Sequence, residues 1–281
     1  MSETTETFWD ILSEKEALFS RAILDELAAQ PWAQQLIKDI TDNGGLTRTN
    51  KSRLFELRYA YSLSQAGIVP SYEIPGEGNS TLDFGFTCEA QNWAVELMRL
   101  EETEAVQNAT QMWVDGDGVT QAELHLYTDA DDPRHSTEGE TIKAVERICQ
   151  KCELNGHPYK FPVPVGKYHA LLVDVRTFLD GCDSEDFIHV GLSGDYVNNE
   201  FCRLRWNGEL ISGVFNERTN LHGAEYARER VHFIGFVDEK DYCPGAFADA
   251  TQFVANPQLF AGPGEALAAI VTWPLQPAIV L

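Results

Sequence analysis

The chain has 281 residues, of which 43% are hydrophobic and 11% aromatic, so it can bury a sizeable core and is not intrinsically disordered. Its 44 acidic and 21 basic residues give a formal net charge of −23, which opposes non-specific attraction to nucleic-acid phosphates. A nucleic-acid role would therefore depend on a local basic patch or on a bridging metal ion.

The sequence carries no targeting signal that we can identify. No apolar run approaches the ~20 residues needed to cross a bilayer. The first residues, 1–6, are acidic and polar, unlike a secretory signal peptide. We therefore expect a cytoplasmic protein without membrane association. The six cysteines are too few for a disulfide framework in a chain of this length, so we expect reduced thiols.

The beginning of the chain predicts an N-terminal helical extension over residues 1–45. Apolar residues recur at helical spacing through 7–41, and Asp42-Asn43-Gly44-Gly45 is a strong stop. The extension could be a structural cap or could bind a partner protein. Because amphipathic helices more often pack than bind, a cap is the preferred interpretation. Residues 46–281 would then form one α/β domain.

A second helix is predicted from Lys51 to Ala66, followed by Gly67. Glu56 lies inside it among apolar residues, either paired with a neighbouring arginine such as Arg53 or Arg58, or as part of a site. The densest group of cations surrounds the start of this helix, whose N-terminus can itself hold a phosphate. The candidate nucleic-acid-binding residues are therefore Arg48, Lys51, Arg53 and Arg58, although ordinary surface charge explains them equally well.

A β-hairpin is the most informative feature of the sequence. An edge strand is expected over residues 68–74, followed by strands over 81–88 and 93–100 that are joined by a polar tetrad. With a four-residue loop, Cys88 would face Trp93.

In that register, two carboxylates come close together on one face of the hairpin. Asp83 and Glu96 would be diagonal neighbours, roughly 7–8 Å apart at the backbone. Carboxylates at that separation repel each other, and a bound divalent cation would relieve the repulsion. The hairpin therefore predicts a cation site.

The middle of the chain contains one long helix and two buried strands. Residues 101–112 are expected to form a polar helix or a connection, and the acidic stretch 115–140 lacks the spacing of a calcium loop. A helix is predicted over 141–152, where the lone pair Cys149 and Cys152 is best explained by core packing. Apolar runs at 171–175 and 231–237 predict buried strands.

Further short features complete the pattern. A strand edge is expected over 202–206, with a turn at Asn207-Gly208, and apolar segments follow at 253–260 and 266–271. The alternation of helices with buried strands indicates an α/β domain.

The order of these elements, and the acidic residues over 50–100, resemble the PD-(D/E)XK superfamily. That resemblance implies a restriction-endonuclease-like, three-layer αβα core with a mixed sheet. Asp83 is similar to the first acid of the motif, Glu96 to the second, and Glu56 to the glutamate of the preceding helix. The resemblance further implies hydrolysis of nucleic-acid phosphodiesters, with Asp83 and Glu96 as ligands of Mg²⁺ or Mn²⁺. Many enzymes of this fold act as homodimers.

The chain departs from the motif at its lysine, where it has Met98. Lys143 and Lys151, on the predicted helix that follows, are the candidates to supply the missing amine. Without such a group the rate would fall, since a positioned acid–base group contributes about 10²–10⁴-fold.

Three interpretations therefore remain open. The first is a metal-dependent nuclease with Glu56, Asp83, Glu96 and one of these lysines as its site. The second is a catalytically inactive interaction or regulatory module on the same fold. The third is an acidic, partner-binding α/β protein whose hairpin carboxylates are merely exposed.

Overall fold

The computed structural model describes residues 13–101, 110–114, 120–124, 137–176, 183–192, 212–276 and 278–281. Its helices are α1 (Glu14–Leu27), α2 (Gln34–Asp42), α3 (Lys51–Gln65), α5 (Thr137–Lys151), α6 (Ser184–Gly191), α8 (His222–Arg230), α9 (Ala246–Asp249) and α10 (Pro263–Ile270), with short 3₁₀ turns at Pro31–Ala33 and Arg48–Asn50. Its strands are β1 (Ser71–Pro75), β2 (Thr81–Cys88), β3 (Gln91–Arg99), β4 (Thr110–Val114), β5 (Thr120–Leu124), β6 (Glu153–Leu154), β7 (His157–Pro158), β8 (Tyr168–Asp174), β9 (Phe233–Val237), β10 (Thr251–Ala255) and β11 (Ile279–Val280).

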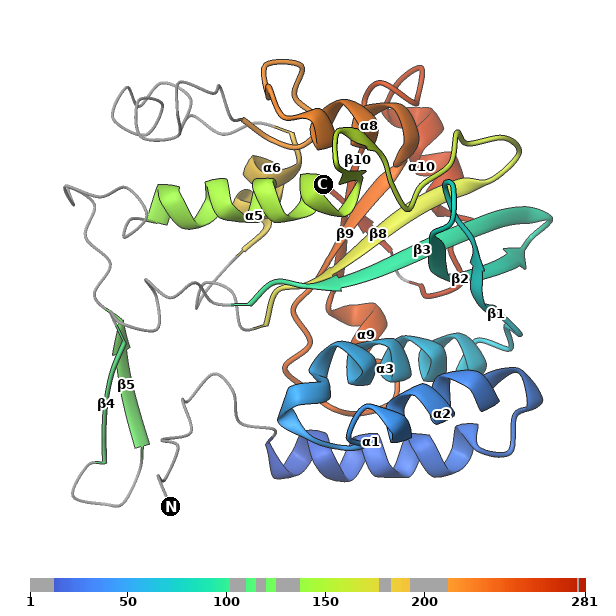
Figure 1. Ribbon diagram of the computed structural model, residues 1–281, viewed down its shortest axis with the longest axis vertical. Coiled ribbons are helices and arrows are strands. Elements are labelled where there is room, and N and C mark those ends of the chain that lie inside the picture. The colour runs from blue at the N-terminus through green and yellow to red at the C-terminus, as the bar shows by residue number, and fades with distance from the viewer. Residues whose placement is uncertain are drawn as a thin grey trace.

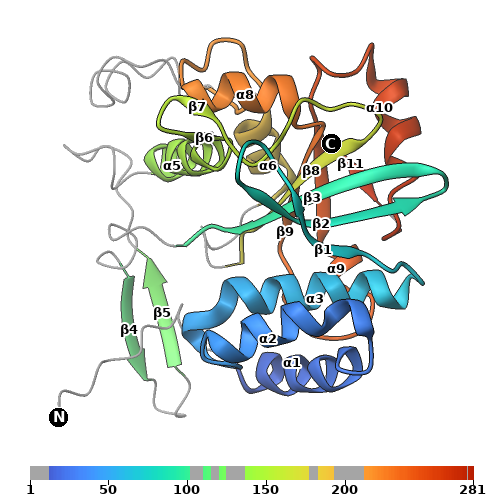
Figure 2. The same cartoon turned by 45° about the vertical axis from the view of Figure 1, so that its right-hand side comes forward.

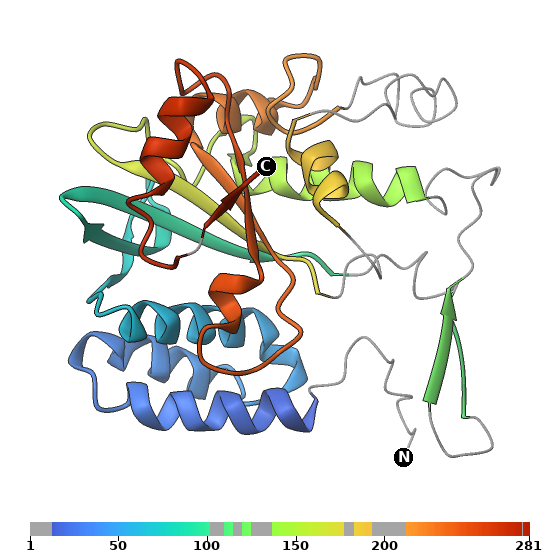
Figure 3. The same cartoon turned by 180° about the vertical axis from the view of Figure 1, so that it is seen from behind.

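A mixed, seven-stranded sheet with the order β1-β2-β3-β8-β9-β10-β11 organises the molecule. The first three strands form an antiparallel meander, and β8 and β9 then continue the sheet parallel to β3. At the far edge β10 runs antiparallel to β9, and the short β11 pairs with β10 (Figure 3). Strands β4 and β5 pair in a sheet of their own, away from the main one (Figure 2). The predicted mixed α/β class is confirmed.

Helices cover both faces of the sheet, as Figure 1 shows, with α1, α2 and α3 below it and α5, α6 and α8 above it. The sheet therefore separates two hydrophobic cores. One contains apolar side chains of α1, α2 and α3, and the other those of α5, α6 and α8. Among the described residues no helix is both long enough and apolar enough to cross a membrane.

The N-terminal helices pack directly against the sheet domain. Instead of one long helix there are two, because Pro31 starts a new turn at a position where it could not continue the first helix. Ile23 and Leu36 are buried in the same core as Leu57 of α3. The described part of the predicted extension thus shares a core with the sheet domain, while residues 7–12 of the predicted helix lie outside the described part of the chain.

The hairpin forms, but its predicted loop and register are wrong. Cys88 pairs with Gln91, so the turn contains only two residues, Glu89 and Ala90. Both have positive φ, at 48° and 65°, which is the signature of a type I′ turn. This turn matches the twist of the strands, and that match outweighed the poor fit of non-glycine residues to a left-handed conformation. The shift places Asp83 opposite Glu96 in the register, rather than diagonal to it.

The other predicted elements are largely confirmed. Strand β1 lies at the edge of the sheet, and β8 and β9 are central and buried, as expected. The helix expected over 141–152 begins one turn earlier, at Thr137. Cys149 and Cys152 are free, buried thiols, which confirms core packing. Residues 115–118 of the acidic stretch, and the predicted strand edge and turn at 202–208, lie outside the described residues.

Candidate functional site

Glu96 is at the centre of the candidate site. Its side chain is 0% exposed, although it lies near the end of β3 where the pairing with β2 stops. Two ammonium groups neutralise it: the Nζ of Lys151 lies 2.8 Å from Oε1, and the Nζ of Lys160 lies 2.9 Å from the same atom. These are ion pairs by distance and lack the alignment of hydrogen bonds, and the other oxygen, Oε2, is buried without a hydrogen-bond partner among the described residues.

Asp83 lies beside Glu96 where the two strands separate. The last β2–β3 pair is Phe84 with Val95, and beyond it the Oδ2 of Asp83 accepts a hydrogen bond of 2.6 Å from the Leu97 N–H. Burial raises the pKa of Asp83 well above its usual range, and the charges of Glu96 and Glu56 raise it further. This shift shows that the three carboxylates are close enough to interact.

The backbone is distorted next to Asp83, which explains how its side chain reaches across the hairpin. On β1 the neighbouring residue Glu73 has a φ of +52°, an uncommon value for a residue with a side chain. Around this point the strand no longer alternates regularly, because Phe84 contributes to one core and Leu82 to the other. Such distortions are tolerated where surrounding structure holds them, often at functional sites.

Glu56 projects from α3 into a polar triad. Arg53 Nη1 lies 3.0 and 2.8 Å from its two oxygens, and the Tyr72 hydroxyl donates to Oε2 at 2.9 Å. Of the alternatives left open for Glu56, pairing with Arg53 is therefore confirmed. Burial nevertheless raises its pKa, a shift that Arg53 and Tyr72 oppose and to which the charge of Glu96 adds. Glu56 is thus both ion-paired and electrostatically coupled to the hairpin carboxylates.

Of the two candidate lysines, Lys151 reaches the carboxylates. Burial lowers its pKa, but Glu96, Asp83 and Glu56 together raise it by more, so the group is an ammonium ion at neutral pH. Lys143 lies two turns earlier on α5, where it pairs with Glu146 at 2.7 Å. We refer to Glu56, Asp83, Glu96, Lys151 and Lys160 as the carboxylate–lysine cluster.

Lys160 was not predicted. It lies in the loop between β7 and β8, where no motif or periodicity marks it, and its backbone is left-handed, with a φ of +62°. Its Nζ also donates to the carbonyl oxygen of Thr81 on β2, at 2.9 Å. Only the tertiary structure brings this loop to the hairpin, since nothing in the local sequence indicates the contact.

The four residues of the predicted basic patch lie in three different environments. Arg53 is 32% exposed beside Glu56. Arg48 and Lys51 line a small cavity of about 180 Å³ with Arg99. Arg58, by contrast, is 1% exposed, so the structure does not place it on a surface where it could contact a phosphate.

Arg58 belongs to a second group of buried charges, at the C-terminal ends of β8 and β9. Its guanidinium pairs with Glu239 at 2.6 Å and with Glu16 at 2.9 Å. Arg176 reaches both oxygens of Asp174, at 2.8 and 2.6 Å, and thereby helps hold the pKa of Asp174 at about 2 despite burial. We call this group the arginine network; its members are Glu16, Arg58, Asp174, Arg176, Glu239 and Tyr242.

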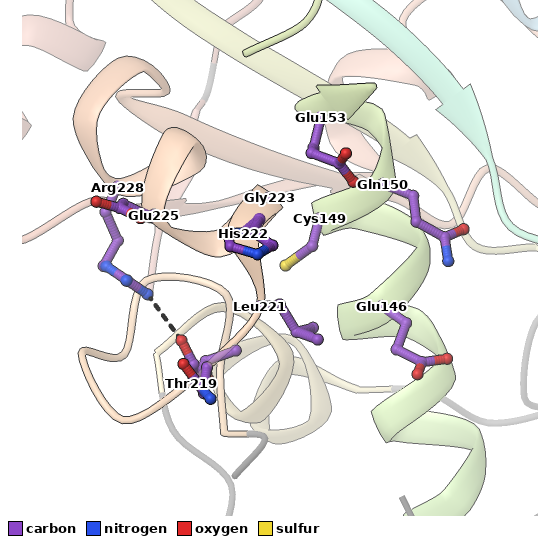
Figure 4. Close-up of a pocket in the computed structure, with 11 residues that line it drawn as sticks. Glu146, Cys149, Gln150, Glu153, Thr219, Leu221, His222, Gly223, Glu225 and Arg228 are labelled. Carbon is purple, nitrogen blue, oxygen red and sulfur yellow. Dashed lines mark hydrogen bonds between the residues drawn. The ribbon is translucent and has the colours of Figure 1, made fainter. Parts of the chain in front are cut away.

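A cavity near the C-terminal end of α5 is a separate feature. It measures about 490 Å³ between α5 and α8, and Cys149 points across it toward α8 (Figure 4). Two of its charged groups have protein partners: Glu146 pairs with Lys143, and Arg228 donates to the carbonyls of Asn216 and Thr219. These contacts give the cavity no arrangement that points to a particular ligand.

The donor atoms of the carboxylate–lysine cluster determine whether a divalent cation fits there. Among the described residues, no group of three or more His, Cys, Asp or Glu side chains is arranged to hold a metal ion. Mg²⁺, however, commonly uses only one or two protein carboxylates, with water completing its shell. The buried, unpartnered Oε2 of Glu96 next to Asp83 meets that smaller requirement.

The third interpretation from the sequence assumed exposed hairpin carboxylates, and the complete burial of Glu96 contradicts that assumption for Glu96. The binding of a partner protein stays a prediction. No protein-family model, no curated protein and no solved structure matches this chain.

Proposed function

We propose that this protein is a metal-dependent, nuclease-like hydrolase of nucleic-acid phosphodiesters with a restriction-endonuclease-like αβα core. The observation that carries the proposal is the meeting of Asp83 and Glu96 with Lys151, whose ammonium lies 2.8 Å from the Glu96 carboxylate. The element order α3, β1, β2, β3, α5, β8 supports it, because this is the order on which the resemblance was based.

Asp83 and Glu96 would hold a single Mg²⁺ or Mn²⁺ ion. Bound there, the ion would polarise a phosphoryl oxygen and lower the pKa of a coordinated water. The protein itself positions the two carboxylates. The hydrogen bond from Leu97 fixes one oxygen of Asp83, and burial between β3 and α5 fixes Glu96.

Lys151 would replace the amine that Met98 cannot supply. Because its pKa is raised, it is a proton donor and a positive charge rather than a nucleophilic amine, which would require a lowered pKa. With 28% of its side chain exposed, it can face both the carboxylates and a phosphate at the site opening. Arg53, held by Glu56, provides a second cation there.

A catalytically inactive interaction or regulatory module on the same fold is the second candidate. Two observations favour it. Met98 replaces the motif lysine, and the net charge of −23 opposes nucleic-acid binding. In this case the carboxylate–lysine cluster would be a neutralised remnant that binds no cation.

Cleavage of plasmid DNA and of single-stranded RNA in the presence of Mg²⁺ or Mn²⁺ tests the proposal. We expect Asp83→Asn and Glu96→Gln to abolish cleavage, and Lys151→Met to reduce it about 10²–10⁴-fold. Lys143→Met is the matched comparison, because it removes a lysine from the same helix where it pairs with Glu146. Equal loss in the two lysine variants would refute the role of Lys151, and absence of cleavage and of cation binding by the folded wild type would favour the inactive module.

A further inference from the structure

Lys160 is more firmly held than its partner lysine. Its Nζ makes two polar contacts, with the Oε1 of Glu96 at 2.9 Å and with the carbonyl of Thr81 at 2.9 Å. Thr81 precedes Asp83 by two residues on β2, so the ammonium connects the strand of one carboxylate to the side chain of the other. Only 15% of the Lys160 side chain is exposed, compared with 28% for Lys151.

The backbone around Lys160 is shaped to hold it there. Its φ of +62° is a conformation that residues other than glycine adopt at a cost. Its carbonyl accepts a hydrogen bond of 2.8 Å from the Glu77 N–H in the turn between β1 and β2. A Cβ at Gly76 would come within 2.5 Å of that carbonyl, so the close approach of the two loops requires a glycine.

The two lysines therefore occupy different positions around one oxygen. Lys151 comes from the end of α5 and interacts electrostatically with all three carboxylates. Lys160 comes from the loop between β7 and β8 and is anchored to β2 through the Thr81 carbonyl. Neither lysine contacts the Oε2 of Glu96, which has no hydrogen-bond partner among the described residues. The ammonium of Lys151 interacts with all three carboxylates, whereas that of Lys160 holds the Oε1 of Glu96.

We propose that Lys160 is a positioning residue that acts as a resident counter-ion of Glu96. It keeps Oε1 occupied and oriented, so that only Oε2 is offered, together with Asp83, to one divalent cation. The proposal rests on the proposed function for the identity of that cation. It adds that the protein limits its own affinity for the cation in order to hold Glu96 in a fixed geometry.

The positive charge of Lys160 determines whether its removal raises or lowers the affinity for a cation. Removal of a positive charge 2.9 Å from a ligand carboxylate makes the site more negative, so cation affinity should rise on the order of tenfold or more. The orientation of Glu96 is lost at the same time, so any hydrolytic kcat should fall. A purely structural role would instead weaken binding and turnover together.

The experiment is calorimetric titration of Mn²⁺ into the full chain as wild type, Lys160→Met and Lys160→Gln. Gln retains a polar group that can reach the Thr81 carbonyl, so it remains informative if the Met variant folds poorly. Lys160→Arg should restore wild-type affinity. Lys167→Met is the charge-matched control, since Lys167 lies just before β8, four residues before Leu171, the register partner of Glu96.

Each outcome is decisive. Tighter Mn²⁺ binding by Lys160→Met and Lys160→Gln, but not by Lys167→Met, supports the inference. Wild-type binding that these variants leave unchanged or weaken overturns it, while the proposed function stands. If the wild type binds no Mn²⁺ but the Lys160 variants do, the inference stands and the metal-dependent function of the wild type fails. If neither binds, both fail.

Discussion

Two aspartates in this protein have opposite electrostatic environments. Asp174, in the arginine network, has both oxygens on Arg176, and its pKa falls to about 2. Asp83 belongs to the carboxylate–lysine cluster, where burial and the charges of two neighbouring carboxylates raise its pKa. Asp174 is fully buried and Asp83 is half-buried, but only Asp174 has cations arranged so that they stabilise the aspartate as an anion.

This difference separates a structural group of charges from the group that we propose to be functional. The arginine network joins α1 and α3 to the ends of β8 and β9, so its members hold separate elements together. The carboxylate–lysine cluster concentrates like charges, and within the described part of the chain a buried oxygen of Glu96 has no hydrogen-bond partner. Unsatisfied groups of this kind cost stability, and they are retained where a ligand or a reaction needs them.

The largest effect should come from breaking the arginine network. Arg58→Met leaves Glu16 and Glu239 buried without their main cation, and loss of one partner of a buried ion pair typically costs about 3–5 kcal/mol. Urea denaturation measures the change. Lys38→Met removes an exposed partner of Asp42 and should leave the midpoint unchanged. A small effect of Arg58→Met would show that the network is not structurally important.

Two buried histidines should make the free energy of unfolding sensitive to acid. Burial lowers the pKa of His169 and of His232 to about 4, so between pH 6.5 and 4 the unfolded chain binds more protons than the folded one. Their contribution is fully present above pH 6.5 and is lost as pH falls to 4, on the order of 2–3 kcal/mol per histidine. Asp174 would add a further loss below pH 3.8.

Urea midpoints from pH 7 to 4 test the histidine contribution. His232→Asn keeps an acceptor for the His169 N–H but cannot take up a proton in this range. The variant should therefore lose less stability with acid than the wild type does. An identical pH dependence of the two proteins would contradict the assignment to His232.

The carboxylate–lysine cluster should respond to substitution with the opposite sign. Asp83→Asn removes one of three crowded carboxylates while its amide oxygen can still accept from the Leu97 N–H. We expect unfolding to require about 0.5–2 kcal/mol more free energy, and cation binding to be lost. Chemical denaturation and Mn²⁺ calorimetry on the same samples measure both. A destabilised variant would show that Asp83 is structural, like Asp174.

The smallest expected effect lies outside both groups, at the hairpin turn. Replacing Glu89 and Ala90 with Asn and Gly fits the two positive φ values and should stabilise the fold by about 0.5–1 kcal/mol. Cation binding should be unchanged. If this variant also lost cation binding, a change in stability alone could explain the result for Asp83→Asn.

Local patterns were sufficient to predict much of the fold. The apolar run of β8, the stop after α3 and the alternation of β2 each reflect a preference within one short segment. The two-residue turn at Glu89 was missed because neither residue favours a left-handed backbone, so the strand pairing, and not the turn residues, decided the register. The error placed Asp83 diagonal to Glu96, whereas the observed register places it directly opposite.

The α/β class and the acidic residues of the hairpin could be read from the sequence, because strand alternation and carboxylate identity are local properties. The cations that meet those acids depend on the packing of distant segments. Lys151 and Lys160 are 55 and 64 residues from Glu96, Arg58 has the same local signal as Arg53 yet is buried, and the distortion at Glu73 depends on its neighbours. Long-range electrostatic pairing is set by how helices and loops pack on the sheet, and no local pattern encodes it.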